Sequence, residues 1–106
     1  MQGLVLVYTT VSSRKEAEKL GGGIVSRRFA SCVNIYPITS MYWWKGKLVK
    51  DKEFALLFKT TKKGAARLER EIKKVHPYEV PCIIASQAKA SKEFFGWIND
   101  VVENGS

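Results

Sequence analysis

The sequence predicts an α+β fold whose elements follow the order β-α-β-β-α-β, with an additional helix at the C-terminus. Three observations support this prediction. Residues 4–10 form an apolar, β-branched run, typical of a strand buried on both faces. Residues 47–60 alternate between apolar and polar side chains, as in a half-buried strand. Between residues 65 and 75 the apolar residues recur every three or four positions, which indicates an amphipathic helix. The length of 106 residues suits a single domain, residues 1–106.

The first strand, residues 4–10, is expected in the middle of the sheet because it lacks a polar face. The following helix is expected to begin at Ser13, since Ser13 and Glu16 have the spacing of a capping box. Three consecutive glycines, residues 21–23, are expected to interrupt this helix. Each glycine costs about 1 kcal/mol relative to alanine in a helix.

A long hairpin is expected next. Residues 32–44 have strand character except at Pro37, which cannot donate to a ladder and therefore indicates an edge strand or a bulge. A Lys-Gly turn leads into the returning strand, residues 47–60. The hairpin is longer than a small domain requires, so the end that carries Trp43 and Trp44 is expected to extend past the core and meet another subunit.

The second half of the chain contains two further helices and one strand. Thr61 is expected to cap a helix that Pro77 ends. Residues 80–88 are expected to form the fourth strand, and Ser91 to cap the final helix. The residues of that helix expected to face inward are Phe94, Trp97, Ile98 and Val101.

This order of elements is the split βαβ, or ferredoxin-like, pattern. The spatial order of the strands is then expected to be fourth, first, third, second. Cys32 and Cys82 would lie on opposite edges, too far apart in one subunit to share a disulfide or a metal. Both edges of the sheet are exposed in a lone subunit, so edge pairing into a closed ring is physically attractive.

The charge balance excludes little by itself. Eighteen basic and ten acidic residues give a net charge of +8, which could serve nucleic acid, an anionic ligand or a solvated surface. Around Arg67 the basic residues alternate with Glu69 and Glu71 at helical spacing, which is typical of a solvated helix face. No nucleic-acid-binding motif accompanies the charge, so a nucleic-acid partner is not expected.

The apolar run near the N-terminus is far too short for a signal peptide or a membrane span. We therefore expect a cytoplasmic protein without a membrane partner. In that compartment Cys32 and Cys82 are expected to be reduced, and their separation matches no close-spaced zinc or redox motif.

Candidate chemistry gathers at residues 76–81, which contain the only histidine and two of the three prolines. Because a proline holds the preceding residue extended, His76 displays its imidazole from a stiff backbone, close to Tyr78 and Glu79. The segment could equally end a helix and start a strand. A firm metal site needs three or four protein ligands, so within one subunit a site is not expected, whereas an intersubunit copper site using His76 with Cys32 or Cys82 stays open.

An enzymatic role is not expected. Cys32 or Cys82 could pair with His76 as a nucleophile, but both cysteines lie among small or apolar residues typical of buried strands. Asp51 and Glu53 alternate with lysines on a strand, which is typical of solvent-exposed polar side chains at the edge of a sheet. The sequence contains no recognisable triad or cofactor loop.

Five segments, in the same order and spacing, closely resemble the CutA divalent-cation-tolerance family: residues 30–35, Ser40 with 42–46, residues 51–53, 58–60 and 76–81. The resemblance implies ferredoxin-like subunits in a homotrimer similar in architecture to PII signalling proteins. It also implies a role in tolerance of divalent metals, especially copper. No obligatory cofactor is expected. Copper(II) or another divalent cation is the candidate ligand, and the candidate metal-binding residues are His76, Cys82, Glu79 and Cys32.

Three positions depart from the family pattern. Some bacterial members carry a cysteine near the end of the first strand and a second histidine before the matching one, where this chain has Tyr8 and Val75. Cys82 stands where relatives commonly have glutamate. An alternative function is therefore kept: a PII-like signalling or scaffold module that binds a small anion or a protein in the intersubunit cleft, helped by Lys59 and Arg67.

Overall fold

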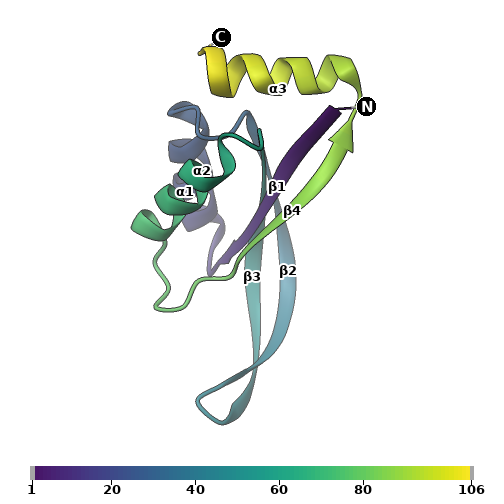
Figure 1. Ribbon diagram of the computed structural model, residues 1–106. Helices are drawn as coiled ribbons and strands as arrows, with labels where there is room; N and C mark the ends of the chain where they lie inside the picture. Colours follow the sequence, from purple (N-terminus) through teal and green to yellow (C-terminus); the bar gives the residue numbers. More distant parts are fainter. Residues whose placement is uncertain (1, 106) are drawn as a thin grey trace.

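The computed structural model describes residues 2–105 and contains the predicted order of elements (Figure 1). The elements are β1 (Gln2–Val11), α1 (Arg14–Ser26), β2 (Cys32–Trp44), β3 (Lys47–Thr60), α2 (Ala65–Val75), β4 (Ile83–Ala90) and α3 (Lys92–Asn104). All strand pairs are antiparallel, and the order β2-β3-β1-β4 confirms the expected one. The edge strands β2 and β4 carry or flank the two cysteines, which confirms that Cys32 and Cys82 lie at opposite edges.

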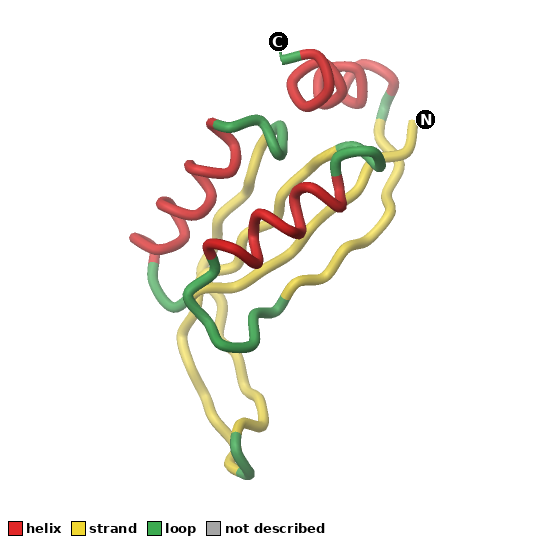
Figure 2. The backbone as a smooth tube through the Cα atoms, turned by 60° about the vertical axis from the view of Figure 1, so that its left-hand side comes forward, coloured by secondary structure: helices red, strands yellow, loops and turns green. Residues whose placement is uncertain are grey.

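Helices α1 and α2 cover the same face of the sheet, and α3 lies over its far end (Figure 2). The main core is formed by apolar side chains from β1, β3 and these two helices, among them Val7, Phe58, Leu56, Ile24, Leu68 and Ile72, all fully buried. No helix in residues 2–105 is long and apolar enough to cross a membrane.

Helix α1 runs without a break through its three glycines, so the expected interruption is wrong. Ser13 caps the helix as predicted, because its hydroxyl accepts a hydrogen bond of 3.1 Å from the amide of Glu16. Gly21 is buried against the sheet, where a Cβ atom would lie 3.1 Å from Val33 and 3.2 Å from Leu56. The missing side chain therefore permits close packing of α1 on the sheet, which offsets the cost of glycine in a helix.

The β2–β3 hairpin extends beyond the rest of the sheet (Figure 1). β1 pairs with β3 only from Phe54 onward, so the part of the hairpin from Ile38 to Glu53 has no third strand beside it. Its turn uses Lys45 and Gly46 with φ of 50° and 77°, the left-handed conformation of a tight hairpin turn. Trp43 near the tip is 73% exposed, which confirms that this end extends past the core.

Pro37 lies within β2 opposite Phe54. β2 is an edge strand, so the prediction that Pro37 marks an edge is confirmed, because only one side of an edge strand needs its backbone amides.

The start of β4 and the inward face of α3 differ from the predictions. β4 begins at Ile83 rather than at residue 80, because Pro81 cannot donate and the chain enters the ladder only after it. In α3, Ile98 is buried as expected, but Phe94 and Trp97 are 41% and 46% exposed. The inward stripe is narrow and continues through Val102, since α3 covers only the end of the sheet.

Helix α2 starts at Ala65, with Gly64 as its N-cap, and not directly after Thr61. Thr61 instead closes the preceding turn, where its hydroxyl accepts a 2.9 Å hydrogen bond from the amide of Gly64. Leu68 and Ile72 are buried as the helical period predicts, whereas Val75 is 48% exposed at the last position before the chain turns away.

Candidate functional site

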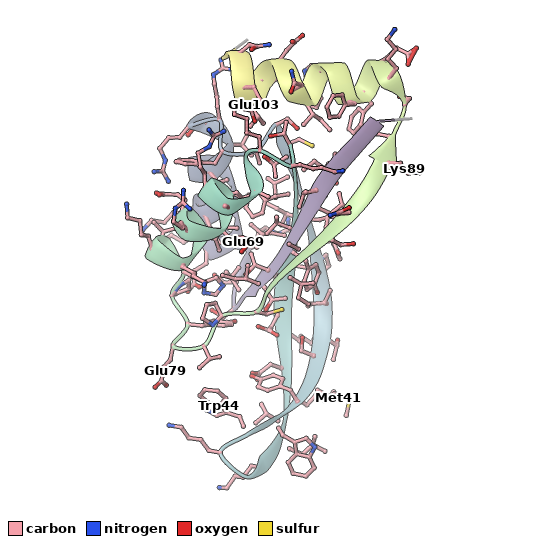
Figure 3. The ribbon with its side chains drawn as sticks, viewed as in Figure 1. Met41, Trp44, Glu69, Glu79, Lys89 and Glu103 are labelled. Atoms are coloured by element: carbon pink, nitrogen blue, oxygen red, sulfur yellow. The ribbon has the colours of Figure 1, made fainter. Side chains whose placement is uncertain are left out.

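A cavity of about 700 Å³ lies between the α2–β4 connection, the end of β1 and the part of the hairpin that extends past β1. Side chains from four places in the sequence line it: Tyr8, Thr10 and Ser12; Ser40, Met41, Tyr42 and Trp44; Asp51 and Glu53; and Tyr78, Glu79, Val80 and Cys82. Figure 3 shows Trp44 pointing from the hairpin toward the side on which Glu79 lies. The residues that resemble the CutA motifs in the hairpin and at 76–81 therefore meet at one cavity.

His76 links the α2–β4 connection to the end of β1 through hydrogen bonds of its imidazole. It follows the last turn of α2 in an extended conformation, as expected for a residue before proline. The amide of Tyr78 donates to His76 Nδ1 at 3.1 Å, so the ring proton is assigned to Nε2, which donates to the carbonyl of Thr10 at 2.9 Å. Both ring nitrogens thus hold backbone atoms in place.

Burial lowers the pKa of His76, against opposing effects of the Thr10 carbonyl and the carboxylates of Glu16 and Glu53. The neutral imidazole agrees with the hydrogen bonds, because Nδ1 can accept from Tyr78 only when it carries no proton.

Tyr78 connects His76 to a carboxylate on the cavity wall. Its ring lies edge-on to the imidazole with centroids 4.9 Å apart, and its hydroxyl donates to Glu53 Oε2 at 2.7 Å. Glu53 is only 7% exposed, so the expectation of a solvent-exposed polar side chain is wrong for this residue. Burial, followed by the hydrogen bond to Glu53, raises the pKa of Tyr78 well above its ordinary value.

A second tyrosine and carboxylate pair lies farther along the hairpin. The hydroxyl of Tyr42 donates to Asp51 Oδ2, and this bond raises the pKa of Tyr42 to about 12. The strand register explains the arrangement, because Asp51 pairs with Ser40, next but one to Tyr42 on the same face. The sequence interpretation treated Asp51 and Glu53 as polar residues of an edge strand, although a spacing of two residues puts both side chains on one face of the strand.

Cys82 presents a half-buried thiol to the cavity. Burial raises the pKa of this thiol, and the Glu53 carboxylate raises it further, so Cys82 is protonated at neutral pH. Burial also raises the pKa of Tyr8, with Cys82 among the neighbouring groups that add to the effect. Glu79 is exposed at the rim of the same cavity.

The four predicted metal-binding residues are therefore brought together only in part. Cys82 and Glu79 line the same cavity, and His76 lies beside it in contact with Tyr78. Cys32 lies at the start of the opposite edge strand, paired with Lys59. Within residues 2–105, no three histidine, cysteine or acidic side chains form a group that could hold a metal ion.

The positive charge gathers elsewhere. Arg67, Arg70, Lys73 and Lys74 of α2 line a second cavity of about 630 Å³ with Phe29 and Glu71. Arg67 lies 3.5 Å from Glu103, and Lys59 donates to Asn34. Neither Lys59 nor Arg67 is among the described residues that line the cavity beside His76.

Comparison with known proteins gives consistent results. The sequence profile of the CutA1 divalent ion tolerance protein family matches residues 5–101. The divalent-cation tolerance protein CutA of Archaeoglobus fulgidus is 40% identical over 98 residues, which cover 92% of this chain and 96% of that protein. The Thermotoga maritima protein of the same name is 37% identical over 100 residues, covering 93% and 99%.

Solved structures agree with these sequence matches. The structure of the periplasmic divalent cation tolerance protein CutA from Archaeoglobus fulgidus superposes with a TM-score of 0.90 at 38% identity, covering 96% of this chain and all of that one. CutA1 from Pyrococcus horikoshii superposes with a TM-score of 0.90 at 31% identity, covering 93% and 98%.

Proposed function

Because the chain belongs to the CutA1 divalent ion tolerance protein family, we propose that it serves in tolerance of divalent metal ions, copper foremost, and binds the ion weakly at an intersubunit site near His76. This family is not one of enzymes, and we propose no reaction. The family match from residue 5 to 101 supports the prediction of one domain over the whole chain.

The observation that carries the proposal is the donor set of the cavity. Cys82 supplies a soft thiol, and Asp51, Glu53 and Glu79 supply carboxylates, a combination that suits copper or another divalent transition metal. The chain has a net charge of +8, yet no lysine or arginine is among the described residues that line this cavity. The local charge therefore favours a cation.

The same donor set accounts for weak binding. The Cys82 thiol must lose a proton before it binds a metal, which makes the affinity dependent on pH. His76 can contribute a nitrogen only if it gives up a hydrogen bond to Thr10 or Tyr78. Copper, when bound, would be held by Cys82, Glu79 or His76 together with ligands of a neighbouring copy, because no three such groups of residues 2–105 lie close enough in one chain.

We further propose that the protein is a homotrimer of PII-like architecture. Members of this family are typically oligomeric. Edge strands β2 and β4 each have a neighbour on one side only, and the hairpin exposes Trp43, Met41 and Leu48 by 73%, 65% and 59%. Such apolar side chains on an extended hairpin support burial between subunits. Cys32 could then be a ligand only from another copy, because within one chain it lies at the opposite edge of the sheet from Cys82.

Isothermal titration of the metal-free, reduced protein with copper tests the site. Cys82→Ser and His76→Ala are each expected to lose most of the heat, whereas Glu69→Gln, a change on α2 away from the cavity, is expected to leave it unchanged. Unchanged titrations of both Cys82→Ser and His76→Ala would refute copper binding here. Sedimentation equilibrium of the same samples tests the trimer.

The alternative function, a signalling module that binds a small anion, has a specific observation in its favour. The four basic residues of α2 line a cavity separate from the acidic one, so an anion would bind at α2 rather than beside His76. A thermal-shift screen of nucleotides and metals separates the two functions, because only a ligand of the folded state raises the melting temperature.

We place the protein in the cytoplasm, where its two free thiols would stay reduced. The Archaeoglobus fulgidus structure is described as periplasmic and the rice relative as chloroplastic. Cell fractionation tests the compartment, and recovery outside the cytoplasm would refute this part.

A further inference from the structure

The aromatic part of the acidic cavity has no role in the proposed copper site. Four rings line it, those of Tyr8, Tyr42, Trp44 and Tyr78. A metal ion needs none of them, and a cavity of about 700 Å³ is far larger than an ion requires. Cavities of roughly 300–1,000 Å³ are typical of sites for small organic molecules.

Among the carboxylates that line this cavity, Glu53 is the buried one, whereas Asp51 and Glu79 are exposed. Glu53 is 93% buried, since only 7% of its surface is exposed. Its Oε2 accepts a hydrogen bond of 2.7 Å from the Tyr78 hydroxyl. A buried carboxylate is costly unless hydrogen-bond donors or a cation compensate its charge. Glu53 therefore presents a largely buried negative charge to the cavity that it lines.

The rings around this carboxylate favour an organic cation. The face of an aromatic ring attracts an ammonium group, and indole does so most strongly. In this chain the Trp44 ring already contacts an ammonium group, because Lys45 Nζ lies 5.7 Å from the ring centroid. Asp51 and Glu79 add negative charge to the lining, and no lysine or arginine is among the described residues that line the cavity.

We propose that this cavity binds a small organic ammonium compound, with Glu53 as its ion-pair partner and the rings of Trp44 and Tyr78 as apolar walls. The proposal concerns the cavity of the proposed copper site but does not depend on copper binding there. A carboxylate selects for the charge of the ligand, and the rings select for its organic part.

Titration of the full chain with cyclohexylamine, in metal-free phosphate buffer at neutral pH, tests this proposal without involving copper. Cyclohexanol has the same shape without the charge and is the matched control. The amine is expected to bind with a dissociation constant of about 1 mM or tighter, and the alcohol at least about tenfold more weakly.

Two variants assign the contacts. Glu53→Gln keeps the shape of the side chain and is expected to weaken amine binding about tenfold or more. Trp44→Leu is expected to weaken it about threefold to tenfold. Glu69→Gln removes a carboxylate outside the cavity and is expected to have no effect.

The proposal is overturned if cyclohexanol binds as tightly as the amine, or if Glu53→Gln binds it unchanged. It is also overturned if the amine fails to bind at about ten times the expected constant, as would happen if a side chain of a neighbouring copy filled the cavity. Far-ultraviolet circular dichroism confirms that each variant is folded. If Glu53→Gln does not fold, Trp44→Leu and the comparison with cyclohexanol decide the question.

Discussion

Replacement of His76 by alanine is expected to destabilise the folded chain by about 2 kcal/mol, because it removes two hydrogen bonds that each contribute about 1 kcal/mol net. The half-buried imidazole holds the Thr10 carbonyl at 2.9 Å and the Tyr78 amide at 3.1 Å. These two contacts join the α2–β4 connection to the end of β1. Their loss leaves both backbone groups in need of other partners.

Urea unfolding, followed by tryptophan fluorescence, measures this change. All samples are compared at one protein concentration, because the stability of an assembly depends on it. The control is Val75→Ala, a change at the preceding residue, which is 48% exposed and is expected to alter stability by less than about 0.5 kcal/mol. A loss below about 0.5 kcal/mol for His76→Ala would contradict the view that His76 fixes this connection.

Two further predictions concern acidity and the glycines of α1. Burial depresses the pKa of His76 in the folded state below 6.5, so its contribution to stability is present above pH 6.5 and is lost as the pH falls below it. The acid branch of the wild-type stability curve should therefore be steeper than that of His76→Ala, and parallel curves would refute the assignment. Gly22→Ala is expected to stabilise the chain by about 0.5–1 kcal/mol, because nothing lies within 4 Å of its Cβ position. Gly21→Ala must push against Val33 and Leu56, and urea unfolding should show it to be less stable than Gly22→Ala.

Much of the fold could be predicted because its local signals agree with its packing. The two-sided apolar run of β1 indicated its central position, and Pro37 indicated an edge strand or a bulge. The length of the two paired strands indicated the extended hairpin. The prediction that the glycines interrupt α1 was wrong because it used helix propensity, which is a local property. Gly21 instead allows α1 to pack closely on two strands. Phe94 and Trp97 were misjudged because their helix covers only the end of the sheet, which its own sequence does not reveal.

A segment that borders the candidate cavity could be identified from the sequence, but the contacts that it makes could not. Residues 76–81 indicated where the cavity lies, since proline and histidine mark that segment strongly. The role of Glu53 depends on the Tyr78 hydroxyl, 25 positions away, and no local sequence pattern predicts such a contact. The double hydrogen bonding of His76 likewise depends on Thr10, which the fold brings beside it from the first strand.

Anomalous diffraction from crystals of the copper-loaded protein, recorded at the copper absorption edge, tests the central proposal most directly. We predict a peak in the cavity beside His76, within bonding distance of Cys82 Sγ and at a boundary between copies of the chain. A peak away from this cavity, or an empty cavity in crystals that bind copper elsewhere, would contradict it.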